Sequence, residues 1–180
     1  DADGEAEFTT NGACPNVLGR LPWKTLGFDN PARDSSGESL WYVVSPNFRD
    51  DASAQPVNVA NKGQVTLDAE TDIAALIIGP GRKLGGQGSR GNTFRPTNRI
   101  ADYLESPTSD NGLTFTTSSA TGPVNDAFVA ISRKELMFGI AQRAAADLDV
   151  QLGAYQLVKD AYPADQATLN TYLDERLPGG

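Results

Sequence analysis

Residues 19–28, GRLPWKTLGF, and residues 40–46, LWYVVSP, contain both tryptophans of the chain, Trp23 and Trp41. The polar residues 29–39 separate these two segments. A tryptophan side chain stabilises a fold most when neighbouring side chains enclose it. We therefore expect Trp23 and Trp41 to pack into one core, on either side of a turn-rich crossing.

Further apolar segments on the C-terminal side of this stretch predict a sheet. Residues 73–78, IAALII, form an unbroken apolar run that stops at a Gly-Pro-Gly sequence, as is typical of a central strand buried on both faces. Alternating residues at 57–59 and 64–67 flank a glycine-containing turn and predict a hairpin. Two more strands are predicted at 113–116 and 127–131. Because the connections are short, we expect antiparallel pairing.

The last third of the chain has a helical pattern. Ser132 and Glu135 have the spacing of a capping box, in which the serine hydroxyl accepts a hydrogen bond from the glutamate amide. Apolar residues then recur at helical spacing: Leu136, Ile140, Ala144, Leu148, Leu152 and Tyr155. We expect a long amphipathic helix up to about Tyr162, where Pro163 prevents continuation, and a second, short helix at residues 164–175.

These patterns predict an α+β fold, with an antiparallel sheet of four or five strands packed on a long C-terminal α-helix. A chain of 180 residues can bury such a core without disulfides or metals. We expect a β-rich domain at residues 1–131. Residues 132–180 are expected to form a helical segment that packs on this domain or extends from it.

Charge is distributed unevenly along the chain. The net charge of −8 argues against binding of nucleic acid or anionic membrane by the whole surface. Residues 82–99 are the exception, because they carry five cations and no acidic residue: Arg82, Lys83, Arg90, Arg95 and Arg99. The glycine spacing matches neither a phosphate-binding loop nor a dinucleotide-binding motif. Two interpretations stay open: a mobile surface loop, or a contact loop that meets acidic neighbours in an assembly, a sugar-bearing surface or DNA. In either case, deletion of residues 82–95 is expected to leave the fold intact.

The composition disfavours an enzyme. The chain has no histidine and one cysteine, which excludes an imidazole-based triad and a zinc site of the usual kinds. Asp126 is expected to fix a turn and Ser132 to cap a helix, rather than to catalyse a reaction. We assign no catalytic residue, no cofactor site and no metal site.

Two features near the N-terminus leave alternatives open. Asp1, Asp3 and Glu5 have the alternate spacing of a cation-binding loop, but the further ligands of a calcium loop do not follow. Cys14 is either a buried free thiol or the partner of a cysteine upstream of this chain, because no disulfide can form within it.

Two blocks of sequence resemble the soluble domains of type IV minor pilins and type II secretion pseudopilins. The first is residues 19–27, GRLPWKTLG, followed by a polar connection and the aromatic strand ending in Val44-Ser45. Residues 34–37, DSSG, stand where the family usually has an Asp-x-Trp-Gly turn, and the aromatic residue is missing. The second block is residues 124–136, VNDAFVAISRKEL, which is similar to the family's Asn-Asp strand and the Ser/Thr-Arg-x-Glu-Leu segment after it.

This resemblance implies a pilin-like fold and a role in a bacterial filament. Such proteins have a hydrophobic N-terminal helix in the inner membrane, which is absent from residues 1–180, so we expect the chain to be truncated. The implied partners are other pilin or pseudopilin subunits. The implied location is the periplasmic face of the inner membrane and the extracellular filament of a Gram-negative bacterium.

Three functions follow, in order of preference. The first is a structural subunit of a type IV pilus or a type II secretion-like filament, acting in assembly, priming or tip contacts. The second is an extracellular adhesin or carbohydrate-binding module that uses Trp23, Trp41 or the basic loop. The third is a carboxylate-dependent hydrolase, which needs two acidic side chains facing each other in a cleft.

Overall fold

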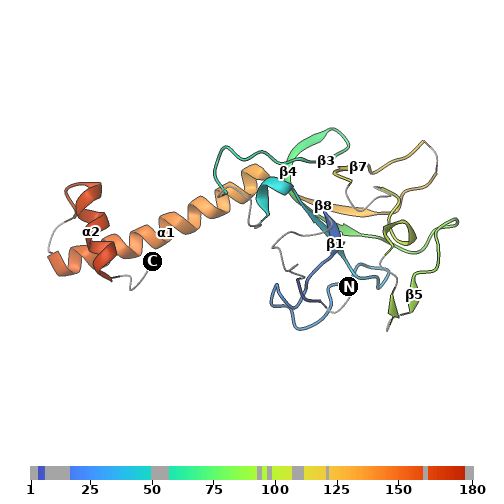
Figure 1. Cartoon of the computed structure of the whole chain (residues 1–180), viewed down its shortest axis with the longest axis horizontal. Coiled ribbons are helices and arrows are strands. Elements are labelled where there is room, and N and C mark those ends of the chain that lie inside the picture. Colours follow the sequence, from blue (N-terminus) through green and yellow to red (C-terminus); the bar gives the residue numbers. More distant parts are fainter. Residues whose placement is uncertain are drawn as a thin grey trace. The chain divides into compact units, whose positions relative to one another are not determined.

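The computed structural model describes residues 4–6, 17–49, 57–92, 95–96, 99–106, 112–120, 122–159 and 162–176. It divides into two compact units, Asp1–Arg133 and Lys134–Gly180. The first unit contains a curled sheet of six strands: β1 (Leu18–Arg20), β2 (Trp41–Val44), β3 (Val65–Leu67), β4 (Glu70–Gly79), β7 (Thr114–Phe115) and β8 (Ala127–Ser132). A separate ribbon pairs β5 (Gly91–Asn92) with β6 (Arg95–Pro96). Two helices follow, α1 (Arg133–Lys159) and α2 (Gln166–Arg176) (Figure 1). The α+β prediction is therefore confirmed at this level.

Strand β4 is the centre of the sheet, as its apolar run predicts. Its partner on one edge is β8, antiparallel, from Ile73↔Ser132 to Gly79↔Ala127. On its other edge β2 and β3 follow one another, both antiparallel to β4. The strand β1 continues the sheet beyond β2, and β7 continues it beyond β3. A single ten-residue strand thus organises both halves of the sheet.

Ser45 joins the two strands that share an edge of β4. Its side chain is fully buried, and its hydroxyl donates to the Ile73 carbonyl at 2.6 Å. The same oxygen accepts hydrogen bonds from the Gln64 amide at 2.8 Å and the Val65 amide at 3.0 Å. Ser45 therefore satisfies three backbone groups at the point where β2 ends and β3 begins, which a buried sheet would otherwise leave unpaired.

The predicted hairpin between residues 57–59 and 64–67 is wrong. Residues 57–60 form no strand, because side-chain bonds hold them in a turn: Asn58 Oδ1 accepts from the Ala60 amide, and Asn61 Oδ1 accepts from the Asn58 amide. Such local bonds compete with strand pairing. The strand β3 instead turns directly into β4, and it pairs with β7 in parallel rather than antiparallel orientation.

One core fills the β-rich unit, and only one tryptophan belongs to it. Trp41 is buried there together with ten other side chains: Leu18, Val43, Val65, Ile73, Leu76, Ile78, Ile100, Tyr103, Leu104 and Phe115. Trp23 is only half-buried and lies outside this cluster, against the backbone of Gly4. The expectation of one core enclosing both tryptophans is therefore wrong for Trp23. The strand β4 is also only half-buried on its second face, at Ala75 and Ile77.

The helical unit begins without a connecting loop, because α1 starts at Arg133 directly after β8. The predicted second helix is α2, where Asp165 accepts hydrogen bonds from the Thr168 amide and hydroxyl at 2.8 and 2.7 Å. These bonds hold the pKa of Asp165 below its ordinary value. Tyr155 of α1 and Tyr172 of α2 are buried and pack edge to face, 5.0 Å between ring centroids.

The predicted apolar stripe of α1 is not a single buried face. Large apolar side chains are exposed at Phe138 and Val150, off the predicted line, and also at Ile140 and Leu148, on it. Residues four apart advance by about 40° around a helix with 3.6 residues per turn, so the predicted series winds around the helix instead of staying on one side. The packing of this helix on the sheet stays a prediction.

Candidate functional site

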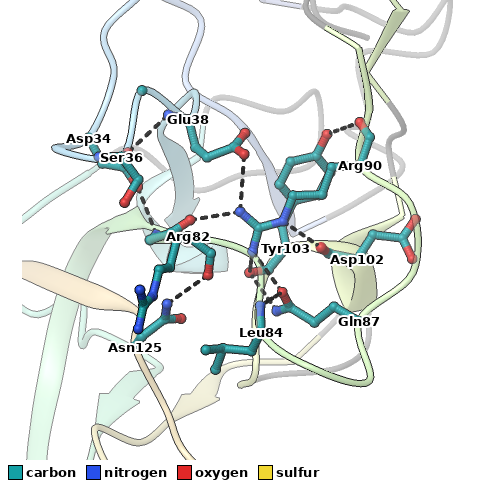
Figure 2. Close-up of polar contacts among 12 residues, drawn as sticks. Asp34, Ser36, Glu38, Arg82, Leu84, Gln87, Arg90, Asp102, Tyr103 and Asn125 are labelled. Carbon is teal, nitrogen blue, oxygen red and sulfur yellow. Dashed lines mark hydrogen bonds and ion pairs between the residues drawn. The ribbon is translucent and has the colours of Figure 1, made fainter.

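Four connections meet at the end of the sheet where β4 finishes and β2 and β8 begin. They are residues 33–39, residues 79–91, the segment 99–106 that starts with a short 3-10 helix (Ile100–Asp102), and Asn125-Asp126. The pairs Trp41↔Ile78 and Gly79↔Ala127 place three strand ends at this edge of the sheet. Polar side chains from all four connections bond the backbone or the side chains of their neighbours here (Figure 2).

Arg90 is the centre of this arrangement and is only 8% exposed. Its guanidinium donates to three backbone carbonyls: Asp102 at 2.8 Å, Gly81 at 2.7 Å and Tyr103 at 3.2 Å. It also donates to Gln87 Oε1 at 2.8 Å and pairs with the Glu38 carboxylate at 3.2 Å. Figure 2 shows these contacts radiating from Arg90 to the surrounding connections. A guanidinium carries five N–H donors in one plane, so a single side chain can hold several segments together.

Aromatic rings support the same cluster. The Tyr103 hydroxyl donates to the Arg90 carbonyl at 2.6 Å, and its ring lies 5.4 Å from that of Trp41. The Arg90 guanidinium lies 5.0 Å from the Tyr103 ring centroid. The Arg20 guanidinium lies 4.6 Å from the same centroid and 4.7 Å from the Trp41 ring centroid. Contacts of this kind add cation–π attraction to the hydrogen bonds. Trp41 therefore links the core to the polar cluster.

The turn at residues 34–37 is built on the carboxylate of Asp34. Its Oδ1 accepts from the Ser36 and Glu38 amides at 2.8 and 2.9 Å, and its Oδ2 accepts from the Gly81 amide at 2.7 Å. Gly81 has φ +62°, and a Cβ there would lie 2.8 Å from Asn125. Glycine is therefore required at this position for both its conformation and its close approach. The turn needs no aromatic residue, because a carboxylate fixes it.

The carboxylates of Glu105 and Asp126 each accept a hydrogen bond from the backbone of the other's segment. The Glu105 amide donates to Asp126 Oδ2 at 2.9 Å, and the Asn125 amide donates to Glu105 Oε2 at 3.1 Å. Asp126 is 9% exposed. Burial, followed by the charge of Glu105 and a hydrogen bond to its side chain, raises the pKa of Asp126 to about 7. The prediction that Asp126 fixes a turn through local hydrogen bonds is wrong, because the Asp126 carboxylate accepts a hydrogen bond from the Glu105 amide, 21 residues away in the sequence.

The basic segment 82–99 is not a set of five available cations. Arg90 is buried in the cluster, Arg82, Lys83 and Arg99 are exposed, and the side chain of Arg95 lies outside the described residues. The interpretation of this segment as a dispensable surface loop is contradicted at Arg90. Charge counting missed this residue, because the sequence does not show which arginine turns inward.

The N-terminal features fall mostly outside the described part of the chain. Asp1, Asp3 and Cys14 are not described, and the described Glu5 lies on the surface, 3.8 Å from Lys24 Nζ. Within the described ranges, the structure brings together no group of three or more side chains able to hold a metal ion. Neither described helix combines the length and the apolar character needed to cross a membrane.

Comparison with known proteins leaves the class of this chain open. No family model, no curated protein and no solved structure matches it.

Proposed function

We propose that this chain is a non-enzymatic structural subunit of the minor pilin or pseudopilin kind, acting in a type IV pilus or a type II secretion-like filament. The observation that carries the proposal is the apolar surface of α1. Six large apolar side chains on this helix are exposed: Phe138, Ile140, Leu148, Val150, Leu157 and Val158. Exposed apolar residues scattered singly need no partner. Val150 and Leu157, however, are seven residues apart and therefore within about 20° of each other around the helix, so one partner can cover both.

Val150 and Leu157 are the most exposed of the six, at 67% and 89%. Burial of each such side chain contributes about 1.5–3 kcal/mol, so a neighbouring subunit that covers several of them gains a substantial affinity. The proposed partners are other pilin or pseudopilin subunits. The proposed location is the periplasmic face of the inner membrane and the extracellular filament, reached through an N-terminal hydrophobic helix that is not part of residues 1–180.

The polar cluster supports a structural role rather than catalysis. The hydrogen bonds of Arg90 and Asp34 described above go to the protein's own backbone and side chains, so these groups hold connections in place. The carboxylates of Glu105 and Asp126 each accept a hydrogen bond from the backbone of the other's segment, whereas the carboxyl groups of glycosidases stand about 5–9.5 Å apart to admit substrate or water. The pair therefore does not favour the hydrolase.

A second candidate function rests on Trp23. This side chain is half-buried, outside the core, and the Lys24 ammonium lies 5.5 Å from its ring centroid. A partly exposed indole beside a polar group is the arrangement expected of an adhesin or a carbohydrate-binding surface. Quenching of Trp23 fluorescence by a saccharide, retained in a Trp41→Phe variant, is the result that would favour this alternative.

The filament proposal is tested by photocrosslinking in cells. A photoreactive residue placed at Val150 or Leu157 of the full-length protein is expected to crosslink to filament subunits, because both positions lie on the proposed contact surface. The matched control is Val59, which is apolar and 75% exposed but belongs to the β-rich unit. Crosslinks from Val59 alone, with none from either helix position, would contradict the proposal.

A further inference from the structure

We propose that Asp126 is held protonated beside Glu105 and that the two residues form a pH-sensitive latch, which fastens the segments 79–90 and 99–106 to the start of β8. This device is independent of the filament proposal. It rests on the mutual position of two acidic side chains, on the backbone groups that they bond and on the burial of one of them.

The geometry of the pair is reciprocal. Asp126 Oδ2 accepts a hydrogen bond from the Glu105 backbone amide at 2.9 Å, and Glu105 Oε2 accepts one from the Asn125 backbone amide at 3.1 Å. These bonds hold the two acidic side chains side by side, each tied to the backbone of the other's segment. Two like charges held this close disfavour ionisation of both carboxyl groups at once.

The environment of Asp126 favours the protonated form. Its Oδ1 is buried and has no hydrogen-bond partner among the residues that the structure describes. The packed segments carry Arg82, Lys83 and Arg90, the acids Asp102 and Glu105 and, in the neighbouring turn, Asp34 and Glu38. Of these, the charge that acts on Asp126 is that of Glu105, which opposes a second negative charge beside it. Its raised pKa of about 7 agrees with this geometry.

The latch controls the segment that carries two exposed cations. Glu105 Oε1 accepts a hydrogen bond from the Gln87 amide group, and Gln87 Oε1 in turn holds the Leu84 amide at 2.9 Å and Arg90 at 2.8 Å. The Asn125 side chain donates to the Arg82 carbonyl at 2.7 Å. Loss of the proton from Asp126 places a second negative charge beside Glu105, and it therefore loosens the backbone that presents Arg82 and Lys83.

The first test measures the protonation directly, by carboxyl 13C NMR titration of the full chain. The Asp126 carboxyl is expected to titrate with a midpoint near 7. In a Glu105→Gln variant the midpoint is expected to fall toward the ordinary range, because the opposing charge is gone. A wild-type midpoint below about 5, close to the ordinary range of an aspartate, would overturn the proposal.

The second test measures stability from about pH 5 to about pH 8 in wild type and Asp126→Asn. The folded-state pKa of Asp126 is raised above its unfolded value, so its stabilising effect is complete below the unfolded pKa and is lost as pH rises to the folded pKa. The wild-type folding equilibrium constant, relative to that of Asp126→Asn, is expected to fall by about tenfold per pH unit up to about pH 7. The side-chain amide introduced by this substitution does not ionise, so the variant lacks this dependence.

Asp68→Asn is the matched control, because Asp68 is an exposed acid whose hydrogen bonds to Thr117 and Thr116 lower its pKa. A lowered folded-state pKa gives stability that is present above the unfolded pKa and lost as pH falls. The Asp68→Asn slope over the same pH range is therefore expected to equal that of wild type. A wild-type slope equal to that of Asp126→Asn would overturn the latch.

Discussion

Replacement of Arg90 by methionine is expected to lower the free energy of unfolding of the β-rich unit by about 3–5 kcal/mol. The variant keeps much of the apolar volume but removes every donor. The carbonyls of Gly81, Asp102 and Tyr103 and the carboxylate of Glu38 then lose their partner. Unsatisfied buried groups of this kind cost more than the bonds contribute when intact.

Urea unfolding followed by tryptophan fluorescence measures this loss, because both tryptophans lie in the β-rich unit. Arg82→Met is the control: it belongs to the same segment, but its side chain is exposed, so a change within about 0.5 kcal/mol is expected. Arg90→Lys keeps the charge, but its single ammonium cannot reach the same set of acceptors, and it is expected to fall between the two. Equal stability of Arg90→Met and Arg82→Met would show that Arg90 does not organise the cluster.

Replacement of Ser45 by alanine is expected to cost about 2–4 kcal/mol, the second largest effect. The hydroxyl serves the Ile73 carbonyl and the amides of Gln64 and Val65 at a fully buried position. Alanine fills nearly the same space but leaves all three groups without their partner. The join between β2 and β3 is therefore expected to open, while the rest of β4 keeps its pairing with β8.

Amide hydrogen exchange measures this opening at two defined positions. The Gln64 and Val65 amides are expected to lose protection in Ser45→Ala and to keep it in Ser36→Ala, which changes an exposed serine. Unchanged protection of both amides in Ser45→Ala would mean that the backbone satisfies these groups without the hydroxyl.

The elements with strong local signals could be predicted from the sequence. The apolar run at 73–78 lies within β4, and residues 127–131 lie within β8. Ser132 precedes a helix that begins at Arg133, and the segment before Pro163 is helical through Lys159. Each of these signals depends on residues close together in the chain, such as an apolar run, a helix-capping residue or a proline.

Most of the errors concern contacts between distant segments. The pattern of residues 64–67 predicted one strand of a local hairpin, but the side-chain bonds of Asn58 and Asn61 hold the other predicted strand in a turn. The strand β3 instead pairs in parallel with β7, which lies far along the chain. Trp23 and Trp41 are both large apolar residues, and no local pattern distinguishes the core residue from the half-buried one.

The candidate site was missed for the same reason. Arg90 reads as one of five equivalent cations, and its inward orientation depends on carbonyls contributed by Gly81, Asp102 and Tyr103. Glu105 and Asp126 meet across a separation of 21 residues. The sequence does place an acidic and an aromatic residue, Asp102 and Tyr103, directly after the basic segment, which has no acidic residue of its own. This pattern does not show which of the basic residues contacts them.

The proposed role of α1 as a contact surface is tested most directly by filament incorporation of a Val150→Asp, Leu157→Asp variant. Both side chains are strongly exposed, so the variant is expected to keep the wild-type unfolding curve. Loss of two apolar contacts at an interface is expected to reduce the amount recovered in the filament fraction by about tenfold or more. Wild-type recovery of this variant in filaments would contradict the account.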